Sequence, residues 1–337
     1  MEIIDITSLL KKEYGIEFVN GEKLKNIYKL TDKNEKQYCL KVIKYNFSHF
    51  NFILSAIFHL QKRGFKKIPN IFLTLEKLPY IKLGKSFAYL TYWVSSRQSN
   101  YDNPLELQLA SEKLGELHKY SEKFIIKKDM KPRVMWFLWE KTFKTRGKEI
   151  LDFEKRIYQK AYKSEFDKLY LSMIKNEIKR VEETLKALEK YNYKKVMIKD
   201  FKSLGFCHHD YAHHNVLIDS KNEVNLIDFD YCILDTNIHD LSSLIIRALK
   251  DGKWEMEKSK LILDSYMKNY RVREEHIPLM SAFIKFPQQF WQVGLQYYWE
   301  RQPWDEENFM RKLLKYKDDI EEREEFLQEF IGFKVVR

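Results

Sequence analysis

The sequence is poor in glycine and proline, with 10 and 7 residues among 337, so long flexible linkers are not expected. Its longest apolar run, FNFILSAIFHL at 50–60, is too short for the roughly 20 residues of a membrane span. The start, MEIIDITSLLKKEYG, lacks a basic stretch followed by an apolar core, so no secretion signal is expected. Three cysteines, Cys39, Cys207 and Cys232, have no metal-type spacing, which indicates reduced thiols in the cytosol.

The composition is that of a soluble globular protein, with 44% hydrophobic and 32% charged residues. The length suggests two domains or one two-lobed unit. A net charge of +11 could attract nucleic acid or a phosphorylated ligand. However, lysines and glutamates alternate along stretches such as KNEIKRVEETLKALEK, and no recognition motif accompanies the charge. We therefore predict neither a nucleic-acid nor a membrane partner.

The pattern predicts an α+β organisation in which a small lobe over 1–94 precedes a mainly helical lobe over 95–337. In the small lobe we expect a short helix at ITSLLKKEY, a hairpin turning at Asn20-Gly21, a strand at QYCLKVIKY, a helix over 47–63, and strands at IFLTL and SFAYLTYWV. In the second lobe, apolar residues at spacings of three and four predict one long amphipathic helix over 164–190. This stripe comprises Ile174, Ile178, Val181, Leu185 and Leu188.

The stretch CHHDYAHHNVLI, residues 207–218, concentrates polar side chains, and its four histidines raise the possibility of a zinc site. The histidines come in adjacent pairs, and neighbouring side chains on a strand point to opposite faces, so each pair would offer one ligand at most. A His209–His213 pair would be possible in a helical loop. Because no cysteine or second acidic cluster completes a site nearby, we keep a metal hydrolase as a lesser alternative.

The spacing that follows favours phosphoryl transfer. Thirteen residues after Asn215, an apolar strand ends in Asp228-Phe229-Asp230. Mg²⁺ prefers hard oxygen ligands, and a hairpin would bring Asn215 and Asp228 together to supply them. Asp210 would take the proton of an attacking hydroxyl from the opposite side, and His208 would brace the loop.

With HHDYAHHNVLI, NLIDFDYC, HDLSSLI and the later FPQQFW at 286–291, the chain resembles the aminoglycoside and choline phosphotransferases, which have a protein-kinase-like fold. Within that superfamily it is most similar to the CotS-type spore coat proteins of endospore-forming bacteria. The resemblance implies a bilobal fold, ATP (or GTP) and Mg²⁺ as cofactors, and a role in the spore coat. It also implies synthesis in the mother-cell cytoplasm and contact with other coat proteins.

The resemblance implies a phosphate-binding lysine in the small lobe. We favour Lys41 over Lys44, because Lys41 shares a strand face with Cys39, which would lie over the nucleotide base. Related kinases hold this lysine with a glutamate on the next helix, yet residues 47–62 contain no acid. Either Ser55, His59 or an acid from elsewhere replaces it, or the lysine is poorly positioned.

Other parts of the kinase-like pattern can be assigned or are missing. No glycine-rich phosphate loop is present, since Gly21 is the one glycine of the first hairpin. Backbone groups at Tyr92, Trp93 and Val94 would pair with the adenine at the hinge. Asp240 resembles the aspartate that starts a large-lobe helix and bonds to the catalytic-loop backbone, although it would also suit a helix N-terminus.

Eleven residues separate Asp228 from Asp240, which leaves no room for a peptide-binding activation segment. We therefore expect a small-molecule acceptor. Aromatic and acidic residues at 286–309 would suit a sugar or a cationic amine, or would form a core beneath the last helices. The rival to an enzyme is a coat component that keeps the fold as a scaffold, which the missing glutamate and glycine loop favour.

Overall fold

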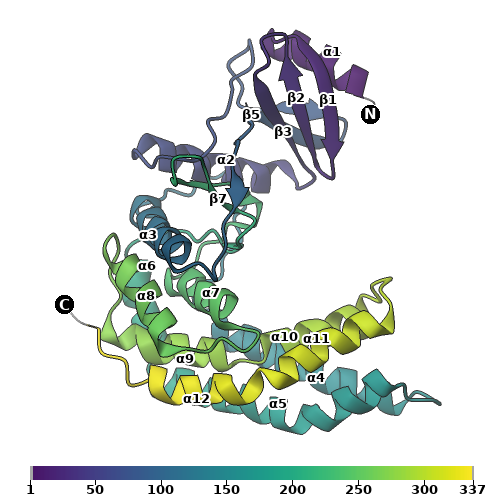
Figure 1. Cartoon of the computed structure of the whole chain (residues 1–337), viewed down its shortest axis with the longest axis vertical. Coiled ribbons are helices and arrows are strands. Elements are labelled where there is room, and N and C mark those ends of the chain that lie inside the picture. Colours follow the sequence, from purple (N-terminus) through teal and green to yellow (C-terminus); the bar gives the residue numbers. More distant parts are fainter. Residues whose placement is uncertain (1–2, 336–337) are drawn as a thin grey trace.

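An antiparallel five-stranded sheet in the order β1-β2-β3-β5-β4 forms the small lobe in the computed structural model, which describes residues 3–335 (Figure 1). Along β2, half-buried and buried residues alternate, because one face of the sheet is covered by helix α1. The elements of this lobe are α1 (Ile3–Tyr14), β1 (Phe18–Leu24), β2 (Ile27–Asp32), β3 (Gln37–Ile43), α2 (Phe47–Lys62), β4 (Ile81–Leu83) and β5 (Ser86–Tyr92).

The first hairpin turns at Lys25-Asn26, so the prediction of a turn at Asn20-Gly21 is wrong. Leu24 pairs with Ile27 across the turn, and Lys25 takes the positive φ of 55°. Gly21 lies inside β1 instead, where a Cβ atom would come within 2.8 Å of the Leu30 side chain. The glycine therefore allows close packing within the strand rather than a change of chain direction.

The segment IFLTL is not a strand, which corrects a second prediction. Among the described residues, only an isolated bridge between Ile71 and Thr91 joins it to the sheet. A tight turn follows at once, since the Thr74 N–H donates to the Leu78 carbonyl at 2.8 Å. Leu73 and Leu75 remain exposed, so the segment buries too little apolar surface to extend the ladder. Strand β4 takes the place beside β5.

Helix α2 belongs to the small lobe by sequence but packs on the large lobe. Its apolar residues join the main core, and the backbone N–H of Lys131 donates to the Ser48 carbonyl at 3.0 Å. His59 and Arg63 both donate to the Glu122 carbonyl. In Figure 1 the helix lies at the junction, below the sheet. The sheet has its own smaller core, which includes Ile6, Leu10, Leu30, Leu40 and Leu90.

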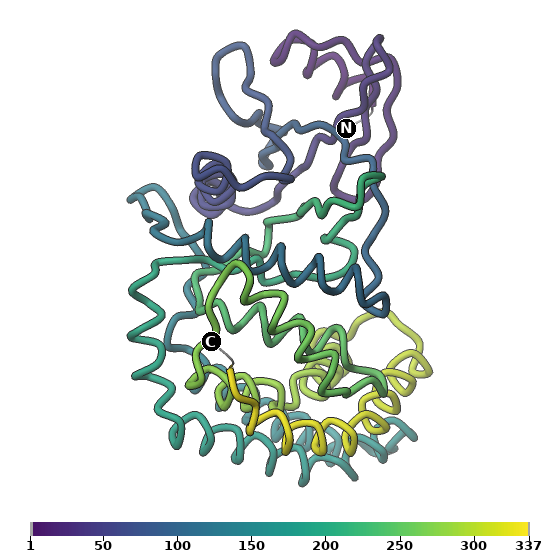
Figure 2. Tube along the Cα trace, turned by 60° about the vertical axis from the view of Figure 1, so that its left-hand side comes forward, coloured from purple at the N-terminus to yellow at the C-terminus, as the bar shows by residue number. Residues whose placement is uncertain are grey.

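The large lobe is mainly helical, and Figure 2 shows the chain descending along one edge of the molecule from the sheet into it. Strand β6 (Arg97–Gln98) pairs with β7 (Val216–Ile218), which pairs in turn with β8 (Val224–Leu226). Its helices are α3 (Pro104–Ser121), α4 (Trp139–Tyr158), α5 (Glu165–Lys190), α6 (Tyr193–Phe201), η1 (Phe229–Tyr231), α7 (Ile238–Leu249), α8 (Met256–Met267), η2 (Glu274–His276), α9 (Ile277–Lys285), α10 (Gln288–Gly294), the π-helix η3 (Leu295–Trp299), α11 (Glu306–Asp318) and α12 (Ile320–Phe330).

Helix α5 fits the predicted long amphipathic helix closely. Ser164 and Asp167 form a capping box at its start, which satisfies two backbone N–H groups. The predicted stripe faces the core, with Ile174, Val181 and Leu188 buried. Within residues 3–335, every helix is too short or too polar to cross a lipid bilayer.

Candidate active site

Asn215 and Asp228 lie at neighbouring ends of two paired strands. Strands β7 and β8 are antiparallel, and just beyond them the Ile227 N–H donates to the Asn215 carbonyl at 3.1 Å. Asp228 follows with a left-handed backbone, φ 64°, which turns the chain sharply out of β8. The short hairpin thus brings together the amide and the carboxylate that the sequence assigns to Mg²⁺.

Asn215 also holds Asp210 in place. Its Nδ2 donates to the Asp210 backbone carbonyl at 2.9 Å and to Asp210 Oδ2 at 3.0 Å. The Asn215 side chain is buried, and no described residue donates a hydrogen bond to its Oδ1. That oxygen and the Asp228 carboxylate, which is 34% exposed, are hard donors of the kind Mg²⁺ prefers. Both residues therefore fit a magnesium ion.

Arg247 is a site residue that the sequence reasoning missed. Its Nη2 donates to Asp210 Oδ1 at 2.8 Å, so both carboxylate oxygens of Asp210 are engaged. Arg247 lies two turns after Asp240 on α7, and therefore on the same helix face. This spacing was the available signal, because a residue that contacts the catalytic loop already begins the helix.

Asp240 and His208 brace the loop from below. The backbone N–H groups of His208 and His209 donate to the two Asp240 oxygens at 2.6 and 2.8 Å. His208 Nε2 donates to the Ile227 carbonyl at 2.9 Å, which ties the loop to the residue before Asp228. Burial opposes the charge of Asp240, but the hydrogen bond from His118 and the nearby imidazoles lower its pKa to about 2. Both residues lie where a supporting role requires them.

Lys41 reaches across from the small lobe to the end of β8. Its Nζ lies 2.7 Å from Asp228 Oδ1 and 2.8 Å from Asp230 Oδ1. Burial opposes the charged form of Lys41, yet the Tyr89 hydroxyl and the two carboxylates raise its pKa. Burial likewise raises the pKa of Asp230 to about 6, whereas Lys41 outweighs burial at Asp228 and lowers its pKa.

Asp230 supplies the counter-charge that helix α2 lacks. Of the two residues considered for this role, His59 is turned toward the Glu122 carbonyl, and Ser55 makes no hydrogen bond within the described part of the chain. Lys44 is exposed and lies beyond the end of β3. Asp230 was visible in the sequence as the third letter of D-F-D, but its direction depends on the turn at η1, which the pattern does not specify.

A cavity of about 550 Å³, here called the interlobe cavity, opens between the small lobe and the end of β8. Lys41 and Asp228 line it, as do the predicted hinge residues Tyr92, Trp93 and Val94. The Trp93 N–H already donates to the Gln37 carbonyl at 2.9 Å. Other lining residues come from the sheet, its first turn, α2 and β7, including Lys23, Lys25, Asn26, Cys39, Ile57 and Leu217.

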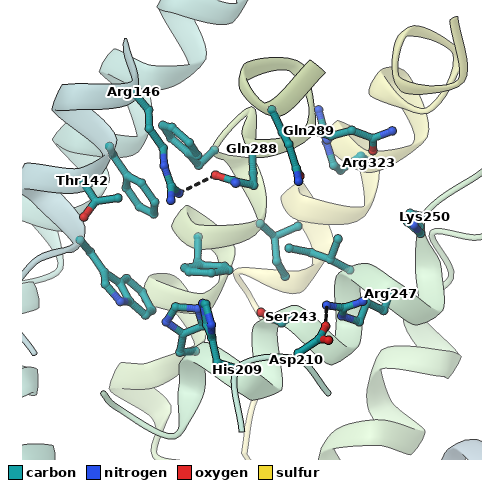
Figure 3. Close-up of a pocket in the computed structure, with 18 of the residues that line it drawn as sticks. Thr142, Arg146, His209, Asp210, Ser243, Arg247, Lys250, Gln288, Gln289 and Arg323 are labelled. Atoms are coloured by element: carbon teal, nitrogen blue, oxygen red, sulfur yellow. Dashed lines mark hydrogen bonds and ion pairs between the residues drawn. The ribbon is translucent and has the colours of Figure 1, made fainter. Parts of the chain in front are cut away.

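A second cavity of about 620 Å³, the large-lobe cavity, lies on the Asp210 side of the loop (Figure 3). Of the aromatic residues in 286–309, Phe286 alone lines this cavity, so the other aromatic residues of that stretch do not contribute to its walls. Phe290 is fully buried, and Trp304 lies against Phe309 and Lys312. Three glutamines of the same stretch line the cavity, namely Gln288, Gln289 and Gln292.

The four loop histidines do not converge on one point. His208 bonds to Ile227, His209 lines the large-lobe cavity, and His213 and His214 are exposed. Within residues 3–335, the group with metal-like proximity is His118, Cys207 and Asp240, all buried. Burial raises the pKa of the Cys207 thiol, and both Asp240 oxygens already accept backbone N–H bonds. The arrangement does not support a zinc centre in this loop.

Comparison with solved structures identifies the fold as that of kinase-like small-molecule phosphotransferases. An aminoglycoside phosphotransferase from Alicyclobacillus acidocaldarius superposes with a TM-score of 0.83 and 22% identity, over 95% of this chain and 94% of that one. Spectinomycin phosphotransferase APH(9)-Ia, in complex with ADP and spectinomycin, gives 0.71 and 15%, over 99% of each chain. Amicoumacin kinase hAmiN, in complex with AMP-PNP, Ca²⁺ and Ami, gives 0.66 and 14%, over 99% of this chain and 96% of that one.

The sequence itself defines the family more closely. The family described as "Spore coat putative kinase YutH" matches residues 7–330, and the chain belongs to it. A search of the curated proteins finds no significant match. The predicted recognition of a CotS-like spore coat family is therefore confirmed, with aminoglycoside phosphotransferases as structural relatives, as is the predicted kinase-like fold.

Proposed function

We propose that this protein transfers the γ-phosphoryl group of ATP, with Mg²⁺, to a hydroxyl group of a small molecule. The observation that carries the proposal is the pair of cavities on either side of one loop. Asp228 faces the interlobe cavity, Asp210 faces the large-lobe cavity, and Asn215 is hydrogen-bonded to Asp210 and adjoins the end of β8. A nucleotide and an acceptor would thus approach the same loop from opposite sides.

Each residue has a role that its position allows. Lys41 would orient the phosphates, while Asn215 and Asp228 would hold Mg²⁺, whose charge offsets that of the phosphates in the reaction. Asp210 would accept the proton of the acceptor hydroxyl. The Arg247 guanidinium fixes the Asp210 carboxylate through a hydrogen bond of 2.8 Å. His208 and Asp240 would keep the loop in the conformation that aligns these groups.

The nucleotide side has support of its own. The structures of related folds were solved with ADP and with AMP-PNP, which favours an adenine nucleotide here. Val94 would supply the adenine contact, because no described residue accepts a hydrogen bond from its N–H, whereas that of Trp93 is engaged. Cys39 lines the same cavity as Lys41, on the strand face where the base would lie.

The scaffold alternative loses its main argument with Asp230. The missing glutamate of α2 suggested a poorly positioned lysine, but Lys41 is held by two carboxylates, so the departure is compensated. The family name still points to the spore coat as the place of action. We therefore place a working kinase among the coat proteins, made in the mother cell, with other coat proteins as neighbours.

A nucleotide-binding experiment tests the proposal. Saturating ATP with Mg²⁺ should raise the melting temperature of the full chain, because a ligand that binds only the folded state stabilises it. Asp228→Asn should lose the Mg²⁺-dependent part of this shift. The matched control is Asp264→Asn, the same change at an exposed carboxylate on α8 outside both cavities. Absence of any Mg²⁺-dependent shift in the wild-type protein would overturn the proposal in favour of the scaffold.

A further inference from the structure

The large-lobe cavity contains more positive than negative side chains. Its walls come from α4, α7, α9, α10, α12 and the catalytic loop. Two carboxylates line it, those of Asp210 and Asp319. Four cationic side chains line it as well, those of Arg146, Arg247, Lys250 and Arg323. A cationic acceptor would therefore meet net repulsion, which argues against the amine that the sequence left open.

Two of these cations already have anionic neighbours. Arg247 is paired with Asp210, as described above. Arg323 is 6% exposed, and burial opposes its charge. Its pKa is nevertheless raised by Tyr316, whose hydroxyl accepts a hydrogen bond from Nη2 at 3.2 Å, and then by Asp319 and Glu177, although its buried Nε has no hydrogen-bond partner within residues 3–335. The Asp319 carboxylate is itself engaged, since Oδ1 accepts the indole N–H of Trp254 at 2.7 Å. The opposite charges of Arg323 and Asp319 offset each other at this wall of the cavity.

Arg146 and Lys250 are less completely neutralised, although Glu149 lies close enough to Arg146 to oppose the lowering of its pKa. Neither forms an ion pair with a carboxylate in the described part of the chain. Arg146 donates one hydrogen bond, to Gln288 Oε1 at 2.6 Å, and its guanidinium lies 4.3 Å from the centre of the Trp291 ring. A guanidinium has five N–H donors, so most of those of Arg146 remain available to a ligand.

Keeping the charged Arg146 guanidinium away from water costs free energy unless an anion or hydrogen bonds compensate it. Burial lowers the pKa of Arg146 to about 10, even though Glu149 opposes the shift. An unpaired cation in a partly dry wall destabilises the protein. A bound carboxylate or phosphate would relieve this cost, and the planar fork of arginine matches both groups in two parallel hydrogen bonds.

The remaining walls suit the rest of such a molecule. Figure 3 shows Arg146 and Gln288 across the cavity from Asp210 and Arg247. Neutral donors and acceptors face the space between them, and they could bind hydroxyl groups. These are Thr142, Ser243, Gln289 and Gln292. A hydroxyl could thus approach Asp210 while an acidic group at the other end of the same molecule lies against Arg146.

We propose that the acceptor is a polyhydroxyl compound with a carboxylate or phosphate group, and that Arg146 binds this acidic group. The inference rests on the proposed phosphotransferase function and adds the chemical class of its substrate. Arg146 acts here as a specificity residue, since an uncharged or cationic analogue of the same shape would lose its charge-assisted hydrogen bonds.

Four compounds with one carbon skeleton provide the test: glucose, glucosamine, gluconate and glucose 6-phosphate. Their effects on the melting temperature of the full chain would be measured with and without ATP and Mg²⁺. Gluconate, glucose 6-phosphate or both should raise the melting temperature more than the other two. Comparison of the two acids tells a carboxylate from a phosphate as the recognised group. The acid that stabilises the protein should also increase ADP release when it is supplied with MgATP.

Arg146→Gln keeps hydrogen-bonding capacity and removes the charge, so it should weaken binding of the acidic compound about tenfold or more. Lys148→Gln, an exposed change on the same helix, is the matched control and should leave binding unchanged. Lys41→Ala should also leave it unchanged, because an acid bound in the interlobe cavity would respond to that variant instead.

The outcomes separate the two proposals. Equal or stronger stabilisation by glucosamine, no stabilisation by any compound, or an acid effect that survives Arg146→Gln overturns the acidic acceptor. A missing shift with MgATP, beside an Arg146-dependent acid effect, overturns the phosphotransferase and leaves an anion-binding cavity. A MgATP shift together with an Arg146-dependent preference for the acids supports both.

Discussion

On one side of the catalytic loop, the Lys41 ammonium lies between two carboxylates, whereas on the other the Arg146 guanidinium has an amide as its hydrogen-bond partner. Both cations are removed from bulk water, so the difference lies in how their charge is neutralised. The charge of Lys41 is balanced by the protein itself, although Lys23 and Lys25 also line the interlobe cavity. The charge of the Arg146 guanidinium would be neutralised by a bound anionic ligand. This contrast predicts opposite effects on stability when each cation is removed.

The largest expected effect concerns Asp210, the proposed catalytic base, which lines the large-lobe cavity. Asp210→Asn should lower the rate of ADP release about 10²–10⁴-fold, because the amide cannot accept the proton of the attacking hydroxyl. Affinity for MgATP, measured by calorimetry, should remain within about twofold, since Asp210 does not line the interlobe cavity. A large loss of nucleotide affinity would contradict the separation of the two cavities.

Lys41→Met tests the balanced side. Removal of the ammonium leaves Asp228 and Asp230 close together without a counter-charge, and we expect the free energy of unfolding to fall by about 3 kcal/mol. Lys44→Met, an exposed change just beyond the same strand, should stay within about 0.5 kcal/mol. Denaturant unfolding measures both. Equal stability of the two variants would mean that the ion pairs contribute nothing.

Asp240→Asn tests the support shared by both cavities, with a pH dependence whose sign is fixed. The folded-state pKa of about 2 lies below the unfolded value of 3.8, so the ionised group stabilises the fold above pH 4. We expect the variant to be about 2 kcal/mol less stable at pH 7. The difference should shrink as the pH falls from 4 toward 2. A constant difference over that range would show that charge is not the cause.

The smallest effect on stability should come from replacing Arg146 in the large-lobe cavity. Arg146→Met removes a desolvated cation and keeps an apolar stem of similar length, so the free energy of unfolding should fall by less than about 1 kcal/mol or rise. Denaturant unfolding beside Lys41→Met makes the comparison direct. A loss as large as that of Lys41→Met would mean that Arg146 is a structural residue.

The sequence predicts most of the fold because its signals are local or periodic. The α5 stripe and the α2 helix follow from apolar spacing and caps within each segment. The predicted position of the first turn is wrong because Gly21 of the turn-favouring dipeptide Asn20-Gly21 instead allows close packing against Leu30. The IFLTL segment fails because the turn at Thr74 competes with strand pairing.

In the candidate site, the residues tied to the motif are brought together as their spacing suggests, whereas the long-range partners are not readable. Asp210, Asn215 and Asp228 are close in sequence, and one hairpin arranges them. Lys41 meets Asp230 from 189 residues away, and Arg146 faces the catalytic loop only through the packing of α4. Tertiary packing of this kind leaves no periodic trace in the chain.

The ion pair between Lys41 and Asp230 has a consequence for control of activity. Protein kinases can be inactivated by rotation of the helix whose glutamate forms an ion pair with the phosphate-binding lysine. Here the acid that pairs with the lysine, Asp230, follows the proposed metal ligand Asp228 by two residues, and the corresponding helix, α2, packs on the large lobe. Rotation of that helix alone would leave the pair of Lys41 and Asp230 in place, so the proposed kinase would not be switched off by this route.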